Sequence, residues 1–168
     1  MLHGNPSWSY YWRHLVLGLR DPAQGKAYRC IVPDHIGMGL SDKPSDKDYT
    51  YTLQSRVDDL TRLLGSLGVD GPLTMAVHDW GGMIGFGWAL THEAQVRRLL
   101  ITNTAAFPLP AAKPLPWQLK LGRDMKLGAL MIRGFNAFAS GAARDGVIRK
   151  MPADVRRAWA ATARWARC

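Results

Sequence analysis

The sequence predicts an α/β protein in which a doubly wound, mostly parallel sheet is followed by an α-helical segment. Over residues 1–106, short apolar runs typical of buried strands alternate with amphipathic segments typical of helices. This alternation favours a parallel sheet whose functional loops gather at the carboxyl ends of its strands. Beyond it, four closely spaced prolines are followed by helical periodicity alone, so we expect a second unit over residues 107–168.

The predicted elements follow one another at short intervals. Thr52 is placed to cap a helix in which leucines and a valine recur at helical spacing. Pro152 is expected to open the last helix. The predicted helices cover residues 8–19, 53–68, 81–90 and the stretch after Pro152, and the predicted strands cover residues 28–33, 73–77 and 96–102.

The most informative stretch is residues 77–82, which read Val-His-Asp-Trp-Gly-Gly. A predicted strand precedes it, and a glycine-rich helix expected to pack closely against its neighbours follows it. A strand, a tight turn and a helix with a nucleophile at the apex form a nucleophile elbow. The apex residue here is Asp79, and a carboxylate can attack an sp³ carbon to give a covalent ester. The alternative is a structural aspartate that caps the helix.

The distribution of charge narrows the classes of function. The net charge is +9, yet residues 1–106 carry 10 Lys/Arg and 10 Asp/Glu, so the whole excess lies in residues 107–168. We interpret this basic region as a solvated surface, with an acidic partner protein or a membrane surface as the alternative. Nucleic acid is not expected, because no recognition module is present. No apolar run has the roughly 18 residues of a membrane span.

Cysteine use and the glycine motifs predict a protein without metal or cofactor. Cys30 and Cys168 give neither a disulfide framework nor a zinc spacing, so we expect a reducing, cytoplasmic environment. Gly37 and Gly39 lack the third glycine of a dinucleotide-binding loop.

Three motifs stand in order along the chain: HGNPSW at residues 3–8, PDHIGMGLSDKP at residues 33–44 and VHDWGG at residues 77–82. Taken together, they resemble those of the haloalkane dehalogenases, which are α/β-hydrolase-fold enzymes. The resemblance implies a partial α/β-hydrolase core over residues 1–106 and a basic helical cap region over residues 107–168. Residues 103–108 and 131–138 look most like a sister branch, the β-lactone (cis-3-alkyl-4-alkyloxetan-2-one) decarboxylases of olefin biosynthesis.

The resemblance implies an apolar small-molecule substrate and roles for three residues. Asp79 would be the nucleophile, and Asn5 and Trp80 would hold the leaving anion, because an amide and an indole N–H are donors. A turn residue and a core aromatic are the alternatives for Asn5 and Trp80. A haloalkane would yield a halide and an alcohol, whereas a long-chain β-lactone would yield a carboxylate and then, by decarboxylation, an alkene.

The remaining titratable candidates are expected to be structural. His3 opens the first motif, His78 braces the elbow, and Asp34 belongs to the turn of the second motif. The other histidines have no partner pattern and are interpreted as surface or turn residues: His14, His35 and His92.

The family also hydrolyses its ester intermediate with a late histidine oriented by a carboxylate. No histidine follows His92, so the general base and orienting acid are absent from this chain. We therefore expect a chain truncated at both ends, from a shortened or frame-shifted gene. The alternatives are a catalytically incompetent remnant and a basic interaction module. An epoxide hydrolase is less favoured, because those enzymes use cap tyrosines and residues 107–168 contain none.

Overall fold

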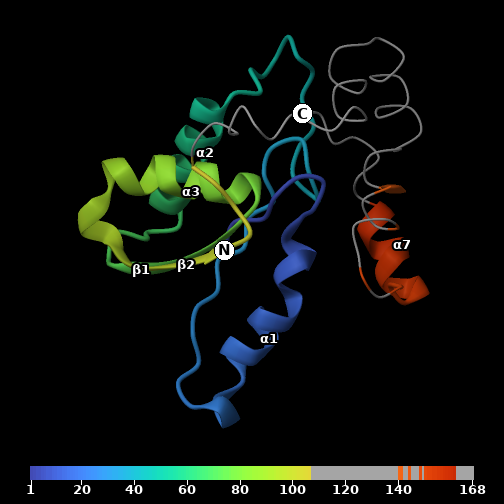
Figure 1. The fold of residues 1–168 in the computed structure, drawn as a ribbon. Coiled ribbons are helices and arrows are strands. Elements are labelled where there is room, and N and C mark those ends of the chain that lie inside the picture. The colour runs from blue at the N-terminus through green and yellow to red at the C-terminus, as the bar shows by residue number, and fades with distance from the viewer. Residues whose placement is uncertain (107–139, 142–143, 145–147, 149, 162–168) are drawn as a thin grey trace, which may run out of the picture.

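The computed structural model describes residues 1–106, 140–141, 144, 148 and 150–161, in which helices pack against a small parallel sheet (Figure 1). The predicted α/β class with a parallel sheet is confirmed. The proposed boundary of the cap region stays a prediction, because residues 107–139 and 162–168 lie outside the described part. Within that region α7 (Ala153–Ala161) begins directly after Pro152, as predicted.

The sheet consists of β1 (Leu73–His78) and β2 (Val96–Thr102), which run parallel and pair from Leu73 opposite Val96 to His78 opposite Thr102. On the other side of β1, Leu2 forms a parallel bridge with Val77. The bridge is made by Leu2 N–H donating to the Ala76 carbonyl at 2.8 Å and His78 N–H donating to the Leu2 carbonyl at 3.2 Å. This pairing brings the first motif to the carboxyl end of β1.

Two helices cover one face of the sheet (Figure 1). The first, α3 (Trp80–Thr91), connects β1 to β2, and α2 (Leu53–Ser66) packs on it. Thr52 caps α2 as predicted, since its hydroxyl accepts a hydrogen bond from the Ser55 N–H at 3.2 Å. The predicted helix over 8–19 is present as η1 (Ser9–Trp12) and α1 (Arg13–Arg20), which lie on the other side of the sheet. Two short 3₁₀ turns complete the set: η2 (Pro22–Gln24) and η3 (Glu93–Gln95).

The core lies between β1 and the two covering helices. Close packing here depends on Gly85 of α3, because a Cβ at this position would stand 2.7 Å from Val77 Cγ1. Burial is uneven across the sheet: residues 75–77 of β1 are buried, whereas residues 99–101 of β2 are exposed. The buried cluster contains Leu2, Val57, Leu60, Leu64, Met75, Val77, Ile84 and Trp88.

The predicted strand over residues 28–33 was wrong. Its apolar and β-branched residues favour an extended conformation, but a strand also requires a ladder of hydrogen bonds with a neighbour. Among the described residues, this segment makes only two such main-chain contacts, from Tyr28 N–H to Leu19 O at 2.9 Å and from the Met1 amino group to Ile31 O at 2.7 Å.

None of the helices in the described part of the chain combines the length and the apolar character that crossing a bilayer requires.

Candidate active site

Asp79 occupies the sharp turn between β1 and α3. Its φ of 50° and ψ of −128° are values that residues other than glycine seldom adopt. The turn is fixed from both sides, since Asp79 N–H donates to Asn103 O at 3.3 Å and Asp79 O accepts from Gly82 N–H at 2.9 Å. The Thr104 hydroxyl also donates to Asp79 O, at 2.6 Å. The predicted strand, tight turn and helix are therefore present, with Asp79 in a strained conformation at the apex.

The first motif lies directly against this turn. A Cβ on Gly4 would overlap the Asp79 side chain, and a Cβ on Gly81 would overlap the main-chain oxygens of Leu2 and His3. Glycine at these two positions is what permits so close an approach.

The carboxylate of Asp79 has one oxygen bound and one oxygen open. Asn5 N–H donates to Oδ1 at 2.8 Å, whereas no described residue hydrogen-bonds Oδ2. A backbone N–H aimed at one oxygen resembles one arm of an oxyanion hole. It would stabilise negative charge on Oδ1 and leave Oδ2 available to attack.

The structure brings Asn5 and Asp79 together through the main chain of Asn5, whereas the sequence suggested its side-chain amide as a donor. Trp80 is the first residue of α3, so it adjoins the nucleophile position. Its side chain is 42% exposed and makes no hydrogen bond with the described residues. An indole N–H in this setting remains free to donate to a ligand.

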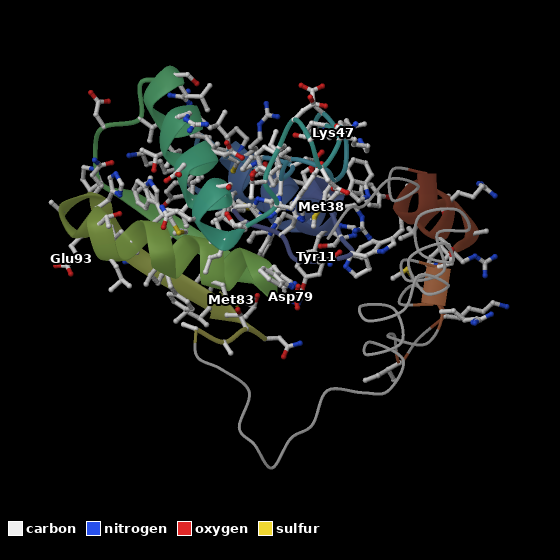
Figure 2. The ribbon with its side chains drawn as sticks, turned by 90° about the horizontal axis from the view of Figure 1, so that it is seen from above. Tyr11, Met38, Lys47, Asp79, Met83 and Glu93 are labelled. Carbon is white, nitrogen blue, oxygen red and sulfur yellow. The ribbon has the colours of Figure 1, made fainter. Side chains whose placement is uncertain are left out.

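An aromatic cluster borders the same turn. The Tyr11 ring stacks on His78 at 4.4 Å and 20°, and it makes edge contacts with Trp12 at 5.0 Å and with Trp159 of α7 at 6.3 Å. Figure 2 shows Tyr11 and Asp79 side by side, at the end of α3 opposite Glu93. Sequence reasoning did not select Tyr11, because its contact with His78 arises only when η1 folds against the end of β1.

Burial and the charge of Asp79 shift the pKa values of Tyr11 and His78 in this cluster. Burial, and then the nearby Asp79 carboxylate, raise the pKa of the Tyr11 phenol, so the phenol stays protonated at neutral pH. Burial lowers the pKa of His78, and the Asp79 charge opposes that shift only in part. His78 is therefore a neutral, half-buried ring packed against Tyr11, and its role in bracing the elbow stays a prediction.

His3 and His35 form a buried pair behind the first motif. The His35 backbone N–H donates to Nε2 of His3 at 3.1 Å, so Nε2 is an acceptor and the proton of His3 lies on Nδ1, which donates to Gly4 O at 2.9 Å. His35 Nε2 in turn donates to His3 O at 3.0 Å. Burial is the main reason that the pKa values of both histidines are lowered.

The expectation that His3 is structural agrees with this buried network. The interpretation of His35 as a surface or turn residue without a partner was wrong, because its ring is buried against His3 at 4.3 Å between centroids. The other two histidines lie elsewhere: His14 is exposed on α1, and His92 stacks on Trp88 at the end of α3.

Asp34 organises the turn of the second motif, as expected. Its Oδ1 accepts a hydrogen bond from Ser9 N–H at 2.6 Å, and its Oδ2 accepts one from Leu40 N–H at 2.8 Å. Gly39, at a φ of 55°, is pressed against this carboxylate, where a Cβ would overlap it. Both oxygens of Asp34 are therefore engaged in holding the turn.

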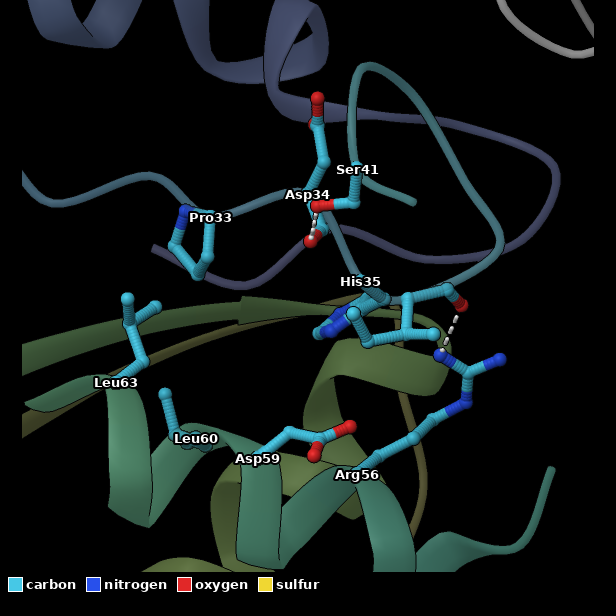
Figure 3. A pocket seen from close by; sticks show the side chains of 9 residues that line it. Pro33, Asp34, His35, Ser41, Arg56, Asp59, Leu60 and Leu63 are labelled. Atoms are coloured by element: carbon cyan, nitrogen blue, oxygen red, sulfur yellow. Dashed lines mark hydrogen bonds between the residues drawn. The ribbon is translucent and has the colours of Figure 1, made fainter. Parts of the chain in front are cut away.

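A cavity of about 270 Å³ lies between this turn and α2, away from the elbow (Figure 3). Its polar groups are occupied by the fold: Arg56 Nη1 donates to Ile36 O at 2.9 Å, and the Ser41 hydroxyl donates to Asp34 O at 2.6 Å. Asp79, Asn5 and Trp80 are not among the residues that line it, so we place the candidate chemistry at the elbow. Across the described residues, no three His, Cys, Asp or Glu side chains are grouped to hold a metal ion.

The parallel sheet, its covering helices and the strained turn define an α/β hydrolase. Residues 1–143 match the α/β hydrolase fold family, and the chain belongs to this family. It is 69% identical over 166 residues to a cis-3-alkyl-4-alkyloxetan-2-one decarboxylase of Xanthomonas campestris pv. campestris, covering 96% of this chain and 54% of that protein. A protein of the same name from Shewanella oneidensis is 55% identical over 150 residues, which is 89% of this chain and 46% of that protein.

Solved structures support the same class. The haloalkane dehalogenase DbeA from Bradyrhizobium elkani USDA94 superposes with a TM-score of 0.77 at 26% identity, covering 95% of this chain and 54% of that chain. The chain thus spans about half the length of the curated relatives it matches. The likeness to both decarboxylases and dehalogenases agrees with the branch that the motifs suggested.

Proposed function

We propose that Asp79 is the nucleophile of an α/β-fold enzyme that opens long-chain β-lactones and releases an alkene. The observation that carries the proposal is the strained Asp79 turn, with one carboxylate oxygen held by Asn5 N–H at 2.8 Å and the other open. The identity of 69% to an oxetan-2-one decarboxylase supports this substrate class, since an oxetan-2-one is a β-lactone.

The first step forms an ester on Asp79. Oδ2 attacks the sp³ ring carbon that bears the ring oxygen, and the bond between that carbon and the ring oxygen breaks. The electron pair of the broken bond stays on the departing oxygen, which becomes part of a carboxylate. The Asn5 side-chain amide and the Trp80 indole N–H are the donors that we assign to stabilise the developing negative charge.

The second step returns Asp79 to its starting state without water. The bond between the new carboxylate and the neighbouring carbon breaks, and its electron pair forms the carbon–carbon double bond. The bond from Oδ2 to the other alkene carbon, which is the carbon that Oδ2 attacked in the first step, breaks at the same time and its electron pair returns to Oδ2, so carbon dioxide and free Asp79 are released. A lactone is thereby converted to an alkene and carbon dioxide with no general base.

A haloalkane is the second candidate substrate, favoured by the likeness to the dehalogenase structure. Attack by Asp79 would release a halide and leave an alkyl ester with no carboxylate to expel. Freeing Asp79 from that ester requires an activated water molecule and therefore a general base. Within the 168 residues no histidine follows His92, so we propose that these residues free Asp79 from the lactone-derived ester but not from the alkyl ester.

Intact-mass spectrometry of the purified chain tests both parts of the proposal. With a bromoalkane we expect one stable alkyl adduct, located on Asp79 by peptide mapping. With a dialkyl β-lactone we expect unmodified chain at the end of the reaction, together with more than one equivalent of alkene and carbon dioxide. Release of several equivalents of alcohol from the bromoalkane would contradict the absence of a base.

A catalytically incompetent remnant predicts at most one alkylation of Asp79 and no repeated release of alkene, so regeneration of free Asp79 over many turnovers would contradict that alternative. A stable lactone adduct would support attack by Asp79 but would refute release by fragmentation. Asp79→Asn is the matched control for both reactions, because it keeps the size of the side chain and removes the nucleophilic charge.

The wider setting of this activity is also part of the proposal. We propose a cytoplasmic enzyme that takes an apolar small molecule, with residues 107–168 as its helical cap region. The exposed Arg156 and Arg157 on α7 support a basic outer surface there. Binding of an acidic partner or of anionic vesicles through this surface should weaken steeply with salt, and binding that is independent of salt would remove that alternative.

A further inference from the structure

We propose that the Tyr11 phenol is a third hydrogen-bond donor for the carboxylate released at Asp79, and that it favours lactones over haloalkanes. This inference rests on the proposed function of Asp79. The sequence motifs do not assign Tyr11 a part in the reaction. Its placement follows from contacts between η1, the end of β1 and α7.

The ring of Tyr11 is held at the edge of the elbow by three aromatic neighbours. It stacks on His78, the residue before Asp79, at 4.4 Å, and it meets Trp12 and Trp159 edge-on at 5.0 and 6.3 Å. In Figure 2 the side chain lies next to Asp79. These contacts fix the ring beside the nucleophile while leaving its hydroxyl unoccupied.

The hydroxyl of Tyr11 has no hydrogen-bond partner among the described residues. Two other partly buried tyrosines differ in this respect, since the Tyr49 hydroxyl donates to Asp59 at 2.5 Å and the Tyr51 hydroxyl donates to Pro44 O at 2.7 Å. Phenols at partly buried sites usually find a partner. An unoccupied phenol beside the candidate nucleophile is therefore available to a ligand.

The protonation state of Tyr11 suits a donor. Burial and the Asp79 charge both raise the pKa of its phenol, which keeps the proton in place at neutral pH. A neutral phenol near that carboxylate adds no repulsion. It can donate to an incoming or departing anion.

The chemistry of the two leaving groups explains why a third donor discriminates between them. A halide is a single, weakly hydrogen-bonding ion, for which the donors of Asn5 and Trp80 suffice. A carboxylate has two oxygens with about four acceptor sites and forms strong, charge-assisted hydrogen bonds. Tyr11 adds a donor that the larger anion can use and the halide does not require.

Tyr11→Phe tests the inference because it removes the hydroxyl and keeps the stack on His78. We would measure the binding of decanoate and of bromide to the chain by quenching of tryptophan fluorescence, and the rate of alkene release from a dialkyl β-lactone. We expect the decanoate Kd to rise about 10-fold or more, and the bromide Kd to stay within about 2-fold, because a hydrogen bond to a charged group is lost only for the carboxylate. Alkene release should slow by a similar factor, and alkylation by a bromoalkane should not.

Two further variants separate hydrogen-bond donation by the Tyr11 hydroxyl from packing of the Tyr11 ring on His78. Tyr10→Phe changes the neighbouring tyrosine, whose ring stacks on Trp8 at 5.3 Å and lies under the Arg13 guanidinium, so it should leave both affinities unchanged. Tyr11→Leu removes the stack as well as the hydroxyl. If only Tyr11→Leu impairs decanoate binding, Tyr11 acts by packing on His78 and the inference is wrong.

The remaining outcomes distinguish this inference from the proposed function. Equal decanoate affinity in wild type and Tyr11→Phe would overturn the donor assignment even if Asp79 is alkylated normally. Loss of decanoate affinity in Tyr11→Phe without any reaction at Asp79 would support the donor and refute the proposed function. A wild-type chain that binds neither anion would also overturn the inference.

Discussion

The turn at Asp34 and the elbow at Asp79 each press a carboxylate against a glycine, Gly39 in one case and Gly4 in the other. At Asp34 both oxygens accept backbone N–H donors, at 2.6 and 2.8 Å. At Asp79 one oxygen accepts a backbone N–H at 2.8 Å, and the described residues leave the other open. Both carboxylate oxygens of Asp34 thus accept a backbone hydrogen bond, whereas only one carboxylate oxygen of Asp79 does.

This difference separates a structural carboxylate from a reactive one. A carboxylate whose two oxygens both accept backbone N–H donors fixes a turn, and those hydrogen bonds stabilise its charge and make it a weaker nucleophile than a carboxylate with one oxygen free of donors. Asp79 also carries the backbone strain, with a φ of 50°, in a turn that Asn103, Gly82 and Thr104 hold in place. Strain retained by surrounding contacts is typical of functional positions. The comparison predicts that substitutions at Asp79 lower the rate of the reaction, whereas substitutions at Asp34 lower the free energy of unfolding.

The largest effect is expected from Asp79→Asn. We expect adduct and alkene formation to fall by at least about 1,000-fold, because removal of a nucleophile abolishes the covalent step. The free energy of unfolding should change by less than about 1 kcal/mol, since only one hydrogen bond to the side chain is altered. Intact mass and urea unfolding measure the two quantities. Retained alkylation in this variant would show that another residue is the nucleophile.

Asp34→Asn should show the opposite pattern. The amide sets an N–H₂ group against one of two backbone donors, so we expect the free energy of unfolding to fall by about 2–4 kcal/mol. Alkylation per folded molecule should stay within a few-fold of wild type. Asp58→Asn on α2 is the control, because Asp58 accepts only a side-chain hydrogen bond from Gln54. A loss of alkylation larger than the loss of folded protein would contradict the structural assignment.

The two glycines sharpen the comparison at smaller scale. Gly4→Ala should slow alkylation by about 10-fold or more, because the added Cβ displaces the Asp79 carboxylate from its attacking position. Gly39→Ala should instead lower stability by about 1–3 kcal/mol, through its positive φ and its overlap with Asp34. Gly65→Ala in α2 meets open space and should be stabilising by about 0.5–1 kcal/mol. Equal effects of Gly4→Ala and Gly39→Ala on the rate of alkylation would contradict the assignment of Asp79 as reactive and Asp34 as structural.

Acid should weaken the fold gradually through the buried histidine pair. The lowered pKa values of His3 and His35 mean that the folded state holds them neutral, while the unfolded chain protonates near pH 6.5. Their contribution is therefore fully present above about pH 6.5 and is lost as the pH falls below it, by up to about 1.4 kcal/mol per pH unit for each histidine. Urea unfolding between pH 7.5 and 5 measures this slope. The slope should be smaller in His35→Gln than in the wild type.

Local sequence signals predicted the elbow because its strand, turn and helix are contiguous in the chain. Thr52 and the residues after Pro152 were likewise assigned correctly from helix-capping chemistry that spans only a few residues. The predicted strand at 28–33 was wrong because an extended segment becomes a strand only when a neighbour pairs with it. His35 and Tyr11 were missed for the same reason, since their partners His3 and His78 lie far away in sequence.

The buried histidine pair has a consequence for spectroscopy. The His3 Nδ1 proton and the His35 Nε2 proton are each hydrogen-bonded to a main-chain oxygen and shielded from solvent. Imidazole protons in exposed rings exchange with water too fast to be observed, but these two should give resolved proton NMR signals. Because His3 donates to Gly4 O, its signal reports whether the first motif is seated against Asp79. The chain therefore carries its own reporter of elbow integrity, readable without substrate.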